Sequence, residues 1–144
     1  MNKIVAIVLA AVCFTIWTGG YVGAVDKTPD QMVQEAKAQI KEVSITDVKK
    51  MIDAKENVIL LDVRDKQEFD EGRIPGAINI SRGMLEFKVA MILPDKNAKI
   101  IVYCSLDLRG PLATKAINDL GYKNAINMAG GLKAWKEAGY PLVK

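Results

Sequence analysis

Short apolar runs alternate with amphipathic segments along most of this sequence. The runs Val58–Val63 and Ile100–Tyr103 are almost wholly apolar and rich in branched side chains, which is typical of strands buried on both faces of a sheet. Shorter runs at Ala77–Ile80 and Ala125–Met128 predict two more strands. The strands alternate with helical patterns, so the sequence predicts an α/β fold in three layers, a mostly parallel sheet flanked by helices on both faces. The main helical patterns cover residues 67–71, 84–91, 112–120 and 132–138.

The first 24 residues have a different pattern from the rest of the chain. Lys3 is followed by an uncharged apolar stretch, Ile4–Trp17, and small residues at Val22–Ala24 resemble a cleavage site. This pattern predicts a secretory signal peptide at residues 1–24 and an exported protein, periplasmic or otherwise extracytoplasmic. An uncleaved membrane anchor is the alternative, because about 20 predominantly apolar residues span a bilayer.

A leading amphipathic helix is expected within residues 25–42, ahead of the main domain. Thr28 is a typical N-cap and Pro29 a typical first helical residue, and apolar residues recur after them at helical spacing. We expect this helix to pack on the domain, with a partner-binding arm as the alternative. The rest of the chain, residues 43–144, has the length and apolar content of one domain.

Composition excludes several kinds of site. The charges are mixed, with a net charge of +3 and no basic block, so nucleic acid is not a predicted partner. The chain has no histidine, which rules out a Cys–His catalytic pair. Cys104 is the only thiol outside the N-terminal segment, so the side chains for a zinc-type site are lacking and no metal or organic cofactor is predicted.

Cys104 is the strongest candidate for chemistry. It follows the predicted strand Ile100–Tyr103 directly, and Pro111 suits the first turn of a following helix. Amide groups at a helix start favour a thiolate and a bound anion, and Arg109 adds a positive charge nearby. The alternative is that Cys104 is a small core residue. If residues 1–24 are removed, Cys104 is the one remaining cysteine, which favours a free reactive thiol.

Three separated segments together resemble the single-domain rhodanese family. They are L-L-D-V-R-D-K-Q-E-F-D-E-G-R-I-P-G-A-I-N-I at Leu60–Ile80, Y-C-S-L-D-L-R-G at Tyr103–Gly110, and N-M-A-G-G-L-K-A-W-K-E-A-G-Y-P at Asn127–Pro141. The resemblance covers about residues 43–144. It implies a rhodanese fold and sulfur transfer, in which a cysteine persulfide passes sulfur from a donor such as thiosulfate to cyanide or a protein thiol.

The resemblance also implies roles for individual residues. Cys104 matches the family's nucleophile, and the backbone amides of the loop that follows it would hold the persulfide and the leaving anion. The loop residues expected to bind substrate are Ser105, Leu106, Asp107, Leu108 and Arg109. Asp62, Arg64 and Glu68 match family positions whose ion pairs support the loop.

The loop also departs from the family pattern. Ser105 stands where arginine is common, and Asp107 stands where glycine is common. A lost positive charge and a gained negative one are expected to weaken the binding of a dianion and to disfavour the thiolate. Alternatively, Asp107 points outward and recognises a basic acceptor.

The length of the loop and its altered residues define the competing functions. Cys104 and Arg109 are separated by four residues, whereas rhodanese-like and tyrosine phosphatases resemble a pattern with five, so the spacing favours sulfur over phosphate. The altered loop leaves a second function open, a non-catalytic binding module or a sulfur carrier for a partner protein. A phosphatase or an arsenate-reducing enzyme is the third alternative.

Overall fold

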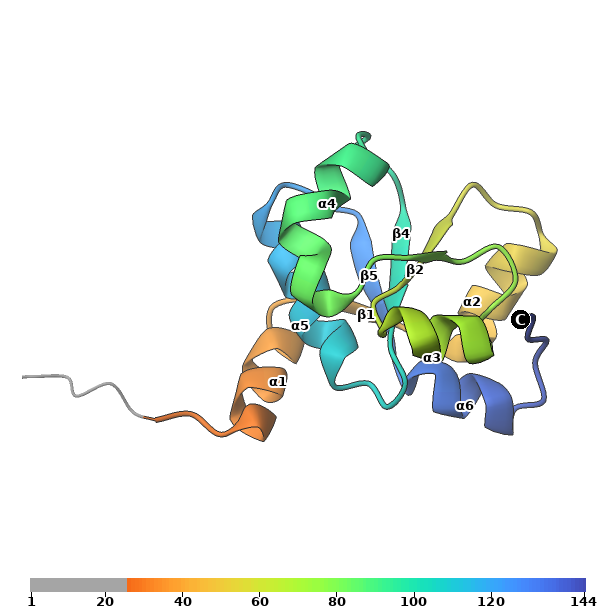
Figure 1. Cartoon of the computed structure of the whole chain (residues 1–144), viewed down its shortest axis with the longest axis horizontal. Helices are drawn as coiled ribbons and strands as arrows, with labels where there is room; N and C mark the ends of the chain where they lie inside the picture. The colour runs from red at the N-terminus through yellow and green to blue at the C-terminus, as the bar shows by residue number, and fades with distance from the viewer. Residues whose placement is uncertain (1–25) are drawn as a thin grey trace, which may run out of the picture.

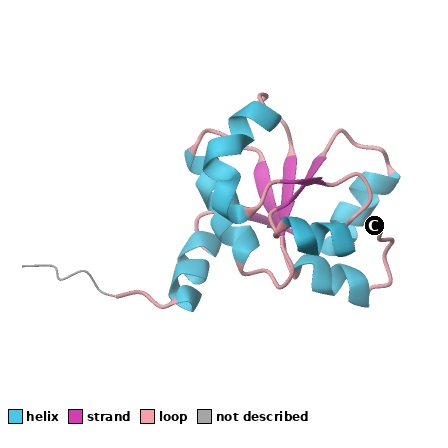
Figure 2. Ribbon diagram, viewed as in Figure 1, coloured by secondary structure: helices cyan, strands magenta, loops and turns pink. Residues whose placement is uncertain are grey.

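The computed structural model describes residues 26–144, which form one central sheet with helices on both sides (Figures 1 and 2). The signal peptide expected at residues 1–24 lies outside the described residues. From residue 26 to residue 144, no helix is long and apolar enough to cross a membrane.

Every neighbouring pair of strands in the sheet is parallel, which confirms the predicted fold class. Within the described residues the sheet has five strands in the order β1-β5-β4-β2-β3. β4 lies in the middle of the sheet, and its four residues are all buried because helices cover both faces. The strands are β1 (Lys41–Val43), β2 (Ile59–Asp62), β3 (Ile78–Asn79), β4 (Ile100–Tyr103) and β5 (Ala125–Met128).

Two apolar cores lie on the two faces of the sheet. In Figure 1, α4 and α5 lie on one side of the sheet and α2 and α6 on the other. Side chains alternate along β4, so Ile100 and Val102 pack in the core on the first side, whereas Ile101 and Tyr103 pack in the core on the second. This alternation produces the three predicted layers. The helices are α1 (Pro29–Lys37), α2 (Ile45–Asp53), α3 (Lys66–Glu71), α4 (Leu85–Ile92), α5 (Arg109–Asp119) and α6 (Gly131–Glu137), and a 3₁₀ turn, η1 (Arg82–Met84), precedes α4.

The leading segment contains both a helix and a strand. Thr28 and Gln31 form a capping box at the start of α1, which fixes where this helix begins. Its buried face carries Val33 and Ala36, and the helix packs against α5. The chain then enters β1, which pairs with β5. The sheet therefore begins at Lys41, two residues before the boundary expected at residue 43.

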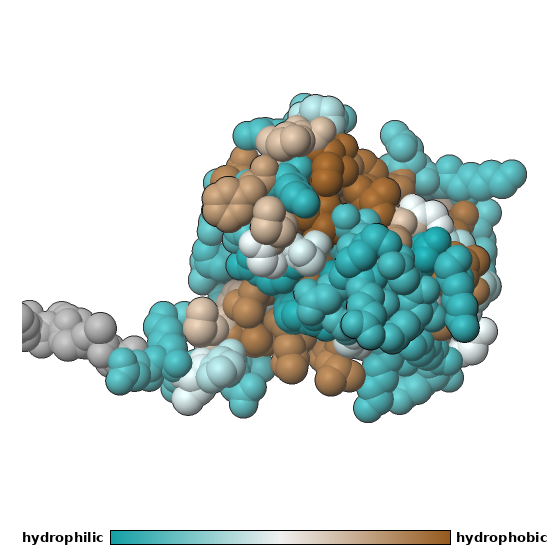
Figure 3. All heavy atoms as spheres, viewed as in Figure 1, coloured by the Kyte–Doolittle hydropathy of each residue, from teal (hydrophilic) through white to brown (hydrophobic). Residues whose placement is uncertain are grey.

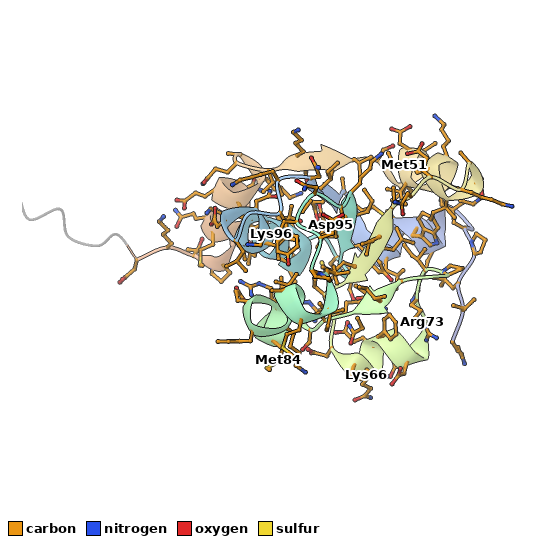
Figure 4. The ribbon with its side chains drawn as sticks, turned by 90° about the horizontal axis from the view of Figure 1, so that it is seen from above. Met51, Lys66, Arg73, Met84, Asp95 and Lys96 are labelled. Atoms are coloured by element: carbon orange, nitrogen blue, oxygen red, sulfur yellow. The ribbon has the colours of Figure 1, made fainter. Side chains whose placement is uncertain are left out.

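The segment after α6 is held against the rest of the fold. Arg73, labelled in Figure 4, forms an antiparallel backbone bridge with Val143, and its guanidinium lies 4.5 Å from the centre of the Phe69 ring. The indole N–H of Trp135 donates to the Pro141 carbonyl at 2.9 Å. Trp135 is itself 1% exposed and belongs to the core.

Candidate active site

Cys104 lies at the carboxyl end of β4, where a parallel sheet typically places its ligands. Residues 105–108 form the loop that follows, and α5 begins at Arg109. The Gly110 amide donates a hydrogen bond to the Cys104 sulfur at an N–S distance of 3.2 Å. This amide belongs to the first turn of α5, where the helix dipole favours negative charge on the sulfur. Cys104 is 1% exposed and also contacts the apolar core between the sheet, α4 and α5.

The carbonyl groups and the amide groups of the loop backbone differ in their hydrogen bonding. The carbonyl of Cys104 accepts from the Leu132 amide at 2.8 Å, and that of Ser105 accepts from the Lys133 amide at 3.0 Å. Among the described residues, the amides of Ser105 to Arg109 donate no hydrogen bond to another group. These N–H groups therefore have no partner within the described part of the chain, and backbone amides of this kind can bind an anion.

Two glycines that sequence reasoning did not single out let this backbone pack closely. A Cβ atom on Gly110 would lie 2.5 Å from the Asn127 amide oxygen. Gly131 has a φ of +60°, and a Cβ atom there would lie 2.7 Å from the Cys104 carbonyl oxygen. Both glycines belong to segments that resemble the family, Gly110 at the end of Tyr103–Gly110 and Gly131 within Asn127–Pro141.

Arg109, Glu68 and Ser105 form one ion-paired group beside the loop. The two terminal nitrogens of Arg109 donate to the two oxygens of Glu68 at 2.8 and 2.9 Å, and the Ser105 hydroxyl donates to Glu68 at 2.8 Å. The hydrogen bond from Arg109, opposed by burial and helped by Ser105, lowers the pKa of Glu68 to about 2. The same bond raises the pKa of Arg109. The guanidinium predicted to bind substrate is thus paired with the carboxylate predicted to support the loop.

Asp62 and Arg64 form a second ion pair, which is buried. Arg64 donates from Nη2 to Asp62 at 2.6 Å and from Nε to both carboxylate oxygens at 3.0 Å. It also donates to the Gly72 carbonyl at 2.8 Å, which ties the end of α3 to the end of β2. Burial favours the neutral form of Arg64, but the hydrogen bond and charge of Asp62 outweigh it, so the pKa of Arg64 is raised.

The other three loop residues differ in their surroundings. Leu106 and Leu108 are 58% and 50% exposed, and apolar surface is visible over α4 and below α5 in Figure 3. Asp107 has a φ of +62°, and its carboxylate contacts Lys37 of α1 and Asn127 of β5. Asp107 therefore does point away from the loop, but its basic partner belongs to the same chain.

A hollow of about 390 Å³ lies between the loop and α6. Lys133 and Lys136 on its wall favour the binding of an anion, and the negative charge of Glu137 offsets part of their positive charge. Within residues 26–144, no cluster of three or more metal-binding side chains is present. The lining residues are Arg64, Ser105, Leu106, Leu132, Lys133, Lys136 and Glu137.

Comparison with known proteins identifies the family of this chain. The family model described as the rhodanese-like domain matches residues 44–138. The chain belongs to this family. This rhodanese-like chain is 34% identical over 98 residues to a proposed sulfurtransferase of Bacillus subtilis, which is 68% of the chain and 92% of that protein. It is also 34% identical over 73 residues to a thiosulfate sulfurtransferase of Escherichia coli, which is 51% of the chain and 69% of that protein.

A solved structure with a different suggested activity also matches the rhodanese-like chain. It is a protein of unknown function from Rhodopseudomonas palustris, described as a possible tyrosine phosphatase, with a TM-score of 0.77 and 30% sequence identity. The match covers 83% of this chain and 96% of that one. The shared fold therefore leaves the choice between sulfur and phosphate chemistry to the loop itself.

Proposed function

We propose that this protein is a sulfurtransferase that carries sulfane sulfur on Cys104 as a persulfide. The observation that carries the proposal is the Gly110 hydrogen bond to the Cys104 sulfur, in a loop whose next five amides have no other partner among the described residues. Donors arranged in this way stabilise a thiolate before the reaction and the charge that forms on the departing group during it. The sulfurtransferase relatives support the same chemistry.

The proposed reaction has two displacement steps. The Cys104 thiolate attacks the outer sulfur of thiosulfate, a new S–S bond forms, the old one breaks, and its electron pair leaves with sulfite. Cyanide or an acceptor thiolate then attacks the terminal sulfur of the persulfide. The S–S bond to Cys104 breaks in that step, which restores the thiolate and releases thiocyanate or a persulfide of the acceptor.

The spacing between Cys104 and Arg109 supports sulfur over phosphate. The loop has four residues between the two, one fewer than the pattern typical of tyrosine phosphatases. Arg109 is also held by both oxygens of Glu68, so its guanidinium is already paired and is not free to clamp a phosphoryl group. The amides of residues 105–109 have no other partner among the described residues, so they are available to bind a persulfide, which carries less negative charge than a phosphoryl group.

The test is thiocyanate formation from thiosulfate and cyanide, compared between the wild-type chain and Cys104→Ser. We expect turnover by the wild type and none by the variant, because the hydroxyl cannot form the persulfide. Incubation with thiosulfate alone should add the mass of one sulfur atom to the wild type only. Lys144→Ala, at the far end of the chain, serves as the unaffected control.

Three outcomes would favour a different function. Hydrolysis of para-nitrophenyl phosphate that depends on Cys104, without thiocyanate formation, would favour a phosphatase. The absence of turnover together with the absence of any added sulfur, also with other persulfide donors, would favour a non-catalytic binding module. Added sulfur without turnover would instead favour a sulfur carrier that needs a specific acceptor protein.

A further inference from the structure

Asp107 adopts a backbone conformation that has a cost for residues other than glycine. Its φ of +62° lies in the left-handed region, which aspartate and asparagine tolerate better than most residues. The side chain of Asp107 makes contacts that offset this cost. The carboxylate is 13% exposed and both of its oxygens are bonded.

The carboxylate is bonded by two segments far away in the sequence. Lys37, the last residue of α1, donates to one oxygen of Asp107 at 2.5 Å. Asn127 of β5 donates to the other oxygen at 2.7 Å and to Glu42 of β1 at 2.8 Å. The Lys37 nitrogen lies 3.5 Å from Glu42. We call these four residues the Lys37–Asp107 anchor, since it joins the leading segment to the Cys104 loop.

The anchor lies in a partly buried place where charge has a large effect. The Lys37 side chain is 26% exposed, and the hydrogen bond to Asp107, opposed by burial, raises the pKa of Lys37. An aspartate without a partner in this loop would repel the anion that the neighbouring amides bind. Lys37 balances this charge and orients the carboxylate toward α1 and β5.

We propose that Lys37 is a positioning residue for the Cys104 loop, acting through Asp107 to hold the loop amides in place and to keep the site attractive to anions. The proposal rests on the proposed sulfurtransferase function. It assigns a role to the leading helix, which lies outside the residues matched by the family model.

The first experiment measures how Lys37→Met changes the site's preference for anions. Iodoacetate and iodoacetamide alkylate the same thiol but differ by one negative charge. We expect the ratio of the two Cys104 alkylation rates, charged over neutral, to fall about fivefold in the variant. The KM for thiosulfate should rise by a similar factor of about five, with a smaller change in kcat. A role in stability alone would change both alkylation rates together.

Matched variants isolate the contact with Asp107. Lys37→Arg keeps the charge and should retain most of the wild-type ratio. Asp107→Asn combined with Lys37→Met removes both charges and should restore the ratio, whereas Lys37→Met alone should not. Lys27→Met removes the same charge from an exposed pair with Glu35 and should leave the ratio unchanged.

Three results would overturn the proposal. They are an unchanged ratio in Lys37→Met with normal circular dichroism, an equal change in Lys27→Met, and an unchanged KM for thiosulfate in Lys37→Met. Alkylation needs no sulfur donor, so this experiment succeeds or fails independently of turnover. A wild type without thiocyanate formation but with the expected ratios would reject the proposed enzyme and keep the anchor.

Discussion

Glu68 is the residue on which both ends of the Cys104 loop depend. Ser105 at the start of the loop and Arg109 at its end donate to the same carboxylate, which α3 holds in place. Because the hydrogen bonds require the charged form, the pKa of Glu68 is lowered to about 2. The stability of the loop is therefore linked to the protonation of one side chain.

We expect Glu68→Gln to lower the free energy of unfolding by about 1 kcal/mol at neutral pH, because a partly exposed ion pair is lost. The ordinary pKa is 4.5 and the folded pKa is about 2, so this stabilisation is fully present above about pH 4.5. It is lost as the pH falls toward 2. Urea unfolding of wild type and variant, at neutral pH and in acid, measures the difference.

Glu71→Gln is the matched control for this prediction. Glu71 lies on the same helix, and its carboxylate only accepts a 3.4 Å hydrogen bond from exposed Gln67. The control should change stability by less than about 0.5 kcal/mol at either pH. A Glu68→Gln deficit that stayed the same from neutral pH to pH 3 would contradict the assignment, because it would not follow the ionisation of the carboxylate.

At the scale of elements, the start of α6 and the Cys104 loop are packed backbone against backbone. The Leu132 and Lys133 amides donate to loop carbonyls, and Gly131 makes room for both. A side chain at Gly131 would collide with carbonyl oxygens of Cys104 and Ser105, at 2.7 and 2.8 Å. These oxygens belong to the backbone and cannot rotate away, so the loop would have to shift.

Gly131→Ala should therefore destabilise the protein by about 3 kcal/mol, from strain at positive φ together with crowding. Gly76→Ala is the matched comparison, because Gly76 has a φ of +79° and a Cβ atom there would have no neighbour within 4 Å. It should cost only about 1 kcal/mol. Urea unfolding measures both variants, and thiocyanate formation should fall in Gly131→Ala alone. Equal costs would show that the close approach to the loop is unimportant.

The elements that the sequence predicted well are those with a strong apolar pattern. β4 and β5 lie at the expected residues because strands buried on both faces have continuous apolar runs. The sequence pattern does not separate β1 from the leading helix, since the strand consists of Lys41, Glu42 and Val43 and lies at the edge of the sheet.

The candidate site was predictable only in part, because only some of its residues belong to a recognisable sequence pattern. Cys104, Arg109 and Glu68 belong to sequence segments that resemble a known family. The contact between Lys37 and Asp107 joins residues 70 positions apart and leaves no periodic pattern. The sequence predicted amides of a helix start beside Cys104, but not that the Gly110 amide is the one that bonds the sulfur.

At the scale of the whole molecule, α1 is part of the folded domain. Val33 and Ala36 are buried, and α1 packs on α5, which begins at the Cys104 loop. Its last residue, Lys37, reaches the loop directly. We therefore expect α1 to unfold together with the sheet in a single transition.

Val33→Ala should lower the free energy of unfolding by about 2 kcal/mol, because two buried methyl groups are lost. Met32 is the neighbouring residue and is 48% exposed. Met32→Ala should therefore change the free energy of unfolding by less than about 0.5 kcal/mol. Urea unfolding followed by circular dichroism and by tryptophan fluorescence should give the same midpoint for each protein. An early separate transition in Val33→Ala would show that α1 unfolds independently.

The antiparallel bridge between Arg73 and Val143 and the pairing of β1 with β5 determine which truncated fragments keep the whole fold. The region recognised by family similarity starts at residue 44 and ends at residue 138. A fragment cut at those borders would lose an edge strand, the tail that bridges to Arg73, and the lysine that balances Asp107. A fragment of residues 26–144 retains all three.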